Sequence, residues 1–291
     1  MYTLFAYTRD PGNRIVRFAV SLDVQTMMTT YLTEQINAFG GAECEEVPFD
    51  GNYKPDHGEM LVLEEFEDLD NLSKVVAAPL DVPIADPDSL DFDQIKALFF
   101  GQLDEDGTWT VYLQSFDRRR VISSSGFSIY HSKDTYKRIE GSGLTLDNKI
   151  AARLSGTKLS FFSFFHVRQI FDMSSYYQEA TDSDIKQFSS LEELYVEDID
   201  DLMAASDAWV RRKVWLVMQS NILNKVPSND IKAIAAEFNI AVDYVNYDGR
   251  EKIRLPSDKK SLKTLLRFLD EDYYKSPLSK TNYLTNSKRA V

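Results

Sequence analysis

The stretch "IKALFFGQLDEDGTWTVYLQSF", residues 95–116, holds two apolar runs separated by a short polar segment. Each run has the length and the rich content of apolar and aromatic residues that strands favour. Between them, Asp106-Gly107 supplies the residues of a tight turn. The stretch therefore predicts an antiparallel β-hairpin, and strands of this kind can be followed outward from it in both directions.

Downstream, a second hairpin is expected around Ser155-Gly156, so that a β-rich layer spans residues 94–165. From residue 166 onward the apolar spacing becomes helical, and short helices are expected over residues 166–171, 172–181 and 182–195. A long helix is expected over residues 206–223, capped by Ser206 or Asp207. The apolar face of the next helix is Ile231, Ile234, Ala235 and Phe238. A strand-turn-strand unit follows over residues 242–255, and a last helix over residues 258–272.

Upstream, residues 3–20 read as a hairpin, residues 23–39 as a helix and residues 59–66 as a strand. Residues 79–93 then contain three prolines and five aspartates, which is typical of a domain boundary. We predict an N-terminal domain over 1–88 and a second domain over 94–291, divided into a β-layer (94–165) and a mostly helical part (166–291). The predicted class is α+β, a mixed β-layer with a small N-terminal α/β domain, because segregated strands and helices disfavour a doubly wound parallel sheet.

The composition limits the kinds of site and segment that the chain can contain. The single cysteine, Cys44, excludes an internal disulfide, and the three histidines (His57, His131 and His166) are scattered. The beginning of the chain lacks the apolar core of a signal peptide, and the aliphatic run at 214–218 is too short to cross a bilayer. We expect a cytoplasmic protein with no metal site, no cofactor and no catalytic residue.

Charge is segregated along the chain. The net charge is −13, yet residues 250–291 contain eleven Lys and Arg against five Asp and Glu, a net charge of +6. Residues 1–249 carry the remaining −19. Two interpretations stay open: the basic end docks on the acidic body, or it binds a polyanion such as DNA.

The last helix concentrates this positive charge. On a helical wheel its basic residues share an arc of about 100°, and Leu262, Leu265, Leu266 and Leu269 occupy the opposite side. Together with the basic tail, this stripe gives the candidate DNA-binding residues Lys259, Lys260, Lys263, Arg267, Lys275, Lys288 and Arg289. The alternative is docking on the acidic residues 191–201, "LEELYVEDIDD", of the same or a neighbouring subunit.

Two other basic clusters lie at residues 118–120 and 211–213. In an extended segment, Arg118 and Arg120 would project to the same side, so they are added as DNA-binding candidates. Residues 211–213 fan around the long helix, and we interpret them as charges that snorkel from a mostly buried helix. A metal-dependent nuclease would need Asp147 or Asp184, each close in sequence to a lysine, but such short matches arise by chance in an acidic chain.

Residues 143–181, "GLTLDNKIAARLSGTKLSFFSFFHVRQIFDMSSYYQEAT", carry a resemblance to a known family. A "KIRLP" strand, a helix ending in "FLDEDYY" and a close "SPLS...YLTNSKR" follow in the same order. From about residue 95 to residue 291 the chain resembles the KwaB-like proteins of Kiwa anti-phage defence. No family motif assigns individual DNA contacts.

The resemblance implies a cytosolic effector that binds DNA without strong sequence specificity and interferes with phage replication or transcription. It also implies a membrane sensor, KwaA, as partner, which could recruit the protein to the inner face of the membrane. A homo-oligomer, expected to be a dimer, is implied as well. The competing hypothesis is an acidic interaction protein or DNA mimic whose basic end binds back in cis.

Overall fold

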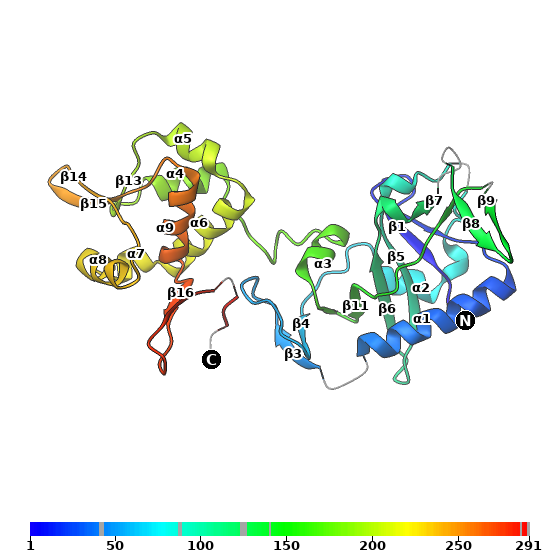
Figure 1. The fold of residues 1–291 in the computed structure, drawn as a ribbon. Helices are drawn as coiled ribbons and strands as arrows, with labels where there is room; N and C mark the ends of the chain where they lie inside the picture. Colours follow the sequence, from blue (N-terminus) through cyan, green and yellow to red (C-terminus); the bar gives the residue numbers. More distant parts are fainter. Residues whose placement is uncertain (41–43, 87–88, 123–126, 140, 286, 290–291) are drawn as a thin grey trace. The chain divides into compact units, whose positions relative to one another are not determined.

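The computed structural model describes residues 1–40, 44–86, 89–122, 127–139, 141–285 and 287–289. The chain folds into two compact units, each of which is described by itself. The N-terminal unit comprises residues 1–49 and 54–173, and the C-terminal unit comprises residues 50–53 and 174–291 (Figure 1). The fold is α+β, as predicted.

The N-terminal unit is built on an eight-stranded mixed sheet in the order β2-β1-β5-β6-β11-β12-β4-β3. The strands are β1 (Phe5–Thr8), β2 (Ile15–Arg17), β3 (Glu45–Pro48), β4 (Glu59–Leu63), β5 (Ile95–Leu103), β6 (Trp109–Ser115), β11 (Ala152–Ser155) and β12 (Lys158–Phe161). Neighbours pair antiparallel except β3 and β4, which are parallel.

The hairpin that decides the class lies at the centre of this sheet. Strands β5 and β6 pair in a continuous antiparallel register from Ala97↔Ser115 to Leu103↔Trp109. Gly107 closes the turn with a φ of 85°, a conformation that glycine adopts without a steric penalty. Alternate β5 residues face opposite sides, and both sides are buried. The central position therefore explains why the run from Ala97 to Phe100 is apolar throughout.

Helices cover both faces of the sheet. Helix α1 (Leu22–Gly40) packs Leu32 and Phe39 into one core with Leu98 and Phe100 of β5. Helices α2 (Leu72–Ala77) and α3 (Phe164–Ile170) contact β5 and β6. On the α2 side, Gly101 leaves the space that Val76 fills, because a Cβ at Gly101 would lie 2.4 Å from the Val76 Cβ.

The boundary expected between residues 88 and 94 does not separate compact units. Strand β1 pairs with β5 across it, and β12 pairs with β4. The proline-rich segment forms the short helix η1 (Pro79–Asp81) and a bridge from Ile84 to Arg17 instead of a linker. Residues 87 and 88 of this segment lie outside the described residues.

Smaller elements complete the N-terminal unit: η2 (Phe92–Gln94), η3 (Arg118–Arg120), β7 (Val121–Ile122), β8 (Ile129–Ser132), β9 (Thr135–Arg138) and β10 (Gly143–Leu144). Strand β7 pairs with β10, and β8 pairs with β9.

The C-terminal unit is mostly helical. Its elements are α4 (Asp182–Ser189), β13 (Leu194–Tyr195), α5 (Ile199–Ala205), α6 (Ala208–Ser220), α7 (Ile222–Lys225), α8 (Ser228–Glu237), β14 (Tyr244–Tyr247), β15 (Arg250–Arg254), α9 (Lys259–Leu269), β16 (Tyr273–Lys275) and β17 (Asn282–Leu284). Helices α4, α6 and α9 pack around one apolar core.

Two local predictions in this unit were wrong. Residues 172–181, expected to form a short helix, contain none. The long helix expected to reach residue 223 ends at Ser220, because Asn221 adopts a left-handed conformation with a φ of 54° and separates α6 from α7. Asp207, one of the two expected caps, does cap α6 by accepting a hydrogen bond from the Val210 N–H at 2.9 Å.

Candidate nucleic-acid interface

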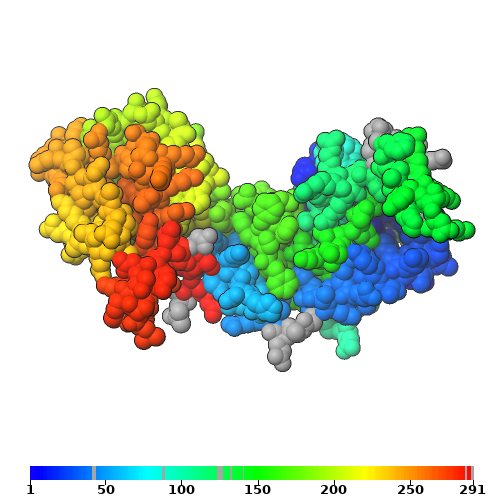
Figure 2. Space-filling view, in the orientation of Figure 1, coloured from blue at the N-terminus to red at the C-terminus, as the bar shows by residue number. Residues whose placement is uncertain are grey.

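Helix α9 is fixed by one side and carries its positive charge on the other. Asp258 caps its first turn by accepting a hydrogen bond from the Ser261 N–H at 2.9 Å. The predicted apolar arc is buried in the core of the C-terminal unit and consists of Leu262, Leu265, Leu266 and Leu269. Figure 2 shows the orange and red residues of α9 and the β16–β17 hairpin at the surface of this unit. The helix therefore presents its basic side chains on a firmly anchored element.

Asp207 neutralises part of this stripe. The Nζ atoms of Lys259 and Lys263 lie 3.0 and 2.9 Å from its carboxylate. Burial opposes its ionisation, but hydrogen bonds from Lys263, the Val210 N–H and Lys259 outweigh burial and hold the pKa of the Asp207 carboxyl well below its usual range. Because Asp207 stays ionised, two lysines of the stripe share one internal counter-charge.

Three basic side chains lie close to the ring of Trp209. Lys263 Nζ lies 5.1 Å, Arg267 Cζ 5.4 Å and Lys213 Nζ 5.7 Å from the ring centroid. These distances fall within the range of cation–π attraction, which holds the cations in place without neutralising them. Lys260, by contrast, is exposed and forms no ion pair within the part of the chain that the structure describes.

The cluster at residues 211–213 does not snorkel as expected. Arg211 pairs with Asp182 at 2.6 Å, Arg212 is 8% exposed, and the Lys213 side chain is only 13% exposed. Lys213 Nζ lies 2.5 Å from Asp270 and 2.6 Å from Asp272. The sequence could not show this, because these partners lie 57 and 59 residues further along the chain.

The basic tail folds back on the same carboxylates. Lys288 Nζ lies 3.2 Å from Asp270 and 3.3 Å from Asp272, and it also donates to the Asp270 main-chain carbonyl. Lys275 pairs with Glu237 at 2.5 Å. Arg289 is exposed, with its guanidinium 5.4 Å from the ring centroid of Tyr53. Of the distinctive terminal residues, Asn286 lies outside those that the structure describes.

A cavity of about 180 Å³ joins the stripe to the tail. Four basic side chains line it, namely Arg212, Lys213, Arg267 and Lys288, together with Trp209 and the single carboxylate Asp272. We use the term cationic surface for these four residues with Lys259, Lys260 and Lys263. Its seven basic side chains form ion pairs with three carboxylates, Asp207, Asp270 and Asp272, while Asp258, Asp50 and Glu179 interact with them at longer range.

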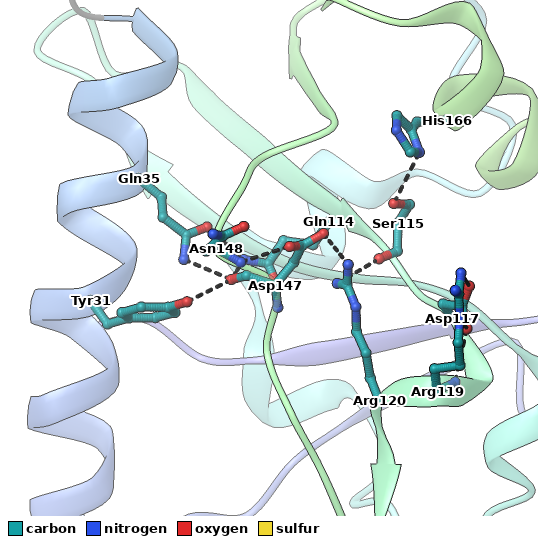
Figure 3. Close-up of polar contacts among 10 residues, drawn as sticks. All are labelled: Tyr31, Gln35, Gln114, Ser115, Asp117, Arg119, Arg120, Asp147, Asn148 and His166. Carbon is teal, nitrogen blue, oxygen red and sulfur yellow. Dashed lines mark hydrogen bonds and ion pairs between the residues drawn. The ribbon is translucent and has the colours of Figure 1, made fainter.

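Arg118 and Arg120 do not project as sequence reasoning expected. Residues 118–120 form the 3₁₀ helix η3, capped by Asp117, so the extended geometry is wrong. Arg118 pairs with Asp93 at 3.2 Å and is 82% exposed, whereas Arg120 turns inward to Asp147 and to the main-chain carbonyl of Ser115 (Figure 3). The two guanidinium groups thus have separate partners.

Asp147 belongs to a hydrogen-bonded network. Its main-chain carbonyl accepts hydrogen bonds from Tyr31, Gln35 and Gln114, as Figure 3 shows. Asp184, the other nuclease candidate, forms the capping box of α4 with Thr181. Within the described residues no group of three or more His, Cys, Asp or Glu side chains could hold a metal ion.

Two acidic side chains of residues 191–201 form ion pairs with β15. Glu192 pairs with Arg250 and Glu197 pairs with Arg254. The sequence left open that the α9 stripe docks on this segment of the same chain. The ion pairs among the described residues do not show such docking. Arg212, Trp209 and Lys213 are the members of the site that sequence reasoning missed.

No helix among the described residues has the length and apolar character required to cross a membrane.

Comparison with known proteins agrees with the resemblance. The family model described as Kiwa protein KwaB-like matches residues 93–279, which is more than half of the chain. No curated protein and no solved structure matches the chain. The matched segment includes β5, β6, α6 and α9, and therefore most of the cationic surface. The chain belongs to the Kiwa protein KwaB-like family.

Proposed function

We propose that this chain is an anti-phage defence effector that binds DNA without strong sequence specificity through the cationic surface. The observation that carries the proposal is one anchored surface on which seven basic side chains form ion pairs with only three carboxylates, in a chain whose overall net charge is −13. Family membership supports a role in Kiwa defence.

The chemistry of the surface favours contact with the DNA backbone. Lysine and arginine side chains neutralise phosphates and release condensed counterions, a source of affinity that does not depend on sequence. Phosphate contacts fix position, whereas base contacts fix specificity. The acidic remainder of the chain repels DNA, so binding is confined to this surface.

The proposal includes the partners that the family resemblance implies. The protein acts with the membrane sensor KwaA, self-associates as a homo-oligomer, and works in the cytoplasm without cleaving DNA. Self-association would place several copies of the cationic surface on one DNA molecule, which raises avidity without new contacts.

The direct experiment incubates the purified protein with labelled duplex DNA of several sequences, at two salt concentrations, in magnesium or manganese. We expect retention of every duplex, weaker at the higher salt, with the DNA left at full length. Fragments that disappear in Asp147→Asn or Asp184→Asn would instead identify a nuclease.

A second candidate, the acidic interaction protein, has one observation in its favour. A cavity of about 430 Å³ in the C-terminal unit is lined by five carboxylates, Glu197, Asp198, Asp201, Asp243 and Asp258, and by Arg254. Such a surface suits a basic partner. Absence of DNA retention even at the lower salt would favour this candidate over DNA binding.

A further inference from the structure

The cavity beside α9 contains a buried guanidinium group without a carboxylate partner. Arg212 is 8% exposed, and its Nη1 donates to the Gln178 carbonyl at 2.9 Å. Its Nη2 lies 3.3 Å from Asn52 Oδ1 and 3.5 Å from the Asp50 main-chain carbonyl. All of these acceptors are neutral. Its Nε has no hydrogen-bond partner within the described residues.

The nearby carboxylates are engaged elsewhere. Asp270 and Asp272 bind Lys213 and Lys288. The Asp50 carboxylate accepts hydrogen bonds from the main-chain N–H groups of the two residues that follow Gly51. Asp270, Asp50 and Glu179 reach Arg212 only through longer-range electrostatic attraction.

Burial of such a charge is unfavourable unless an anion accompanies it. Desolvation lowers the pKa of Arg212, yet a guanidinium remains protonated in proteins, so the group cannot escape the cost by losing its proton. The ring of Tyr177, with its centroid 4.2 Å from the guanidinium carbon, compensates in part. The unused hydrogen-bonding capacity at Nε adds to the cost of this burial.

A second guanidinium group lines the same cavity. Arg267 is half-buried over the Trp209 ring, and its side chain forms no hydrogen bond or ion pair within the described residues. Two forked donors that share a space and lack carboxylate partners suit an oxyanion with several oxygens.

The loop at residues 50–53 is shaped around Arg212. Gly51 has a φ of +77°, and a Cβ built there would lie 2.6 Å from Arg212 Nη2 and 2.9 Å from Tyr177 Cδ2. Glycine thus permits a backbone approach that any side chain would block. The same position offers a way to disturb the cavity without removing a charge.

We propose that this cavity binds the terminal phosphate of a nucleotide, with the sugar and base outside it. At about 180 Å³ the cavity is smaller than the roughly 300 Å³ at which pockets begin to enclose whole ligands, so it fits a phosphoryl group but not a nucleoside. The phosphate belongs either to a free nucleotide or to a DNA 5′ end. The second source rests on the proposed DNA binding, whereas the first does not.

The first test uses calorimetric titration of the full chain with inorganic phosphate, pyrophosphate and deoxyadenosine monophosphate at constant ionic strength. The wild-type protein should bind pyrophosphate and the nucleotide with a saturable heat. Arg267→Gln should weaken both about tenfold to a hundredfold, because a charge-assisted hydrogen bond is lost. Lys186→Gln, an exposed lysine of α4 outside both the cavity and the cationic surface, should bind as the wild type does.

The second test identifies the source of the phosphate. Duplexes of one sequence, with 5′-phosphate or 5′-hydroxyl ends, are compared for binding to the wild type and to Arg267→Gln. A preference for the phosphorylated ends that disappears in Arg267→Gln assigns the site to DNA ends. Equal binding of the two duplexes, together with nucleotide binding, assigns it to free nucleotides. If neither duplex is bound, the proposed DNA binding is wrong. The calorimetric titration with nucleotide still tests whether the cavity binds phosphate.

Gly51→Ala is a second variant, which separates a loss of phosphate binding from a loss of folding in Arg267→Gln. It keeps every charge but pushes a methyl group against the guanidinium, so it should weaken phosphate binding while circular dichroism stays unchanged. The inference is overturned if the wild type gives no saturable heat with any of the three ligands. It is also overturned if Arg267→Gln and Gly51→Ala, both folded, bind them as the wild type does.

Discussion

At the scale of single residues, Asp207 has two roles that oppose each other for DNA binding. Its carboxylate caps α6 and holds Lys259 and Lys263, which stabilises the fold. The same carboxylate is a negative charge within the cationic surface, and it repels phosphate. Stability and affinity should therefore respond in opposite directions to its neutralisation.

Asp207→Asn keeps a capping side chain but removes the charge. The free energy of unfolding should fall by about 1 kcal/mol or less near neutral pH, because the ion pairs are partly exposed. The folded-state pKa is depressed, so this stabilisation is present above the unfolded value of about 4 and is lost as the pH falls toward the folded value. Denaturant unfolding at several pH values should show the wild type and variant converging in acid.

The same variant should bind duplex DNA more tightly, with a salt dependence steeper by up to about one unit, because one more cation becomes available. Weaker DNA binding by a folded Asp207→Asn protein would contradict this role.

Lys213 and Lys288 share two carboxylates but differ in burial. The Lys213 side chain is 13% exposed against 33% for Lys288. Lys213→Met should therefore destabilise the C-terminal unit by roughly 3–5 kcal/mol, as expected when a buried pair loses one partner. Lys288→Met should cost about 1 kcal/mol. Equal losses in denaturant unfolding would contradict the ranking.

At the scale of elements, the packing of α2 against the β5–β6 hairpin depends on the absence of a side chain at Gly101. Gly101→Ala would force its Cβ against Val76, which is 4% exposed, and should cost about 1–3 kcal/mol by overpacking. Adding Val76→Gly should recover part of that loss, since it removes the Cβ at 2.4 Å together with both methyl groups. Thermal unfolding of the two single variants and the double variant measures this coupling, and simple additivity would argue against the contact.

Local patterns predicted local elements well. The alternating runs around Asp106-Gly107 gave the β5–β6 hairpin, and the leucine spacing gave the buried side of α9. Pairing over long sequence distances was not visible: β1 joins β5 across the proline-rich segment, so the expected boundary failed to separate compact units. The ion-pair partners could not be predicted from the sequence either, because Asp147 pairs with Arg120 and Asp270 pairs with Lys213 from distant segments of the chain.

At the scale of the whole molecule, the segregation of charge is only partly satisfied within the fold. Carboxylates of the same unit bind Lys259, Lys263, Lys213 and Lys288, while Lys260, Arg212 and Arg267 have no ion pair within the described residues. Loss of the last six residues is not a clean test of DNA contact, because it would remove Lys288 from Asp270 and Asp272. Substitution of the basic residues of α9 leaves its buried leucines in place and removes only partly exposed ion pairs with Asp207.

The salt dependence of duplex DNA binding tests the central claim most directly. We compare the wild type with Lys259→Gln/Lys263→Gln/Arg267→Gln and with a control, Lys137→Gln/Lys186→Gln/Lys225→Gln, in which three exposed lysines outside the cationic surface are replaced. Both variants change the net charge equally. Because Asp207 already neutralises one of the three α9 charges, the first variant should flatten the slope of log K against log salt by about two units, and the control by much less than one. A slope unchanged from the wild type, or flattened equally by the control, would contradict DNA binding through this surface.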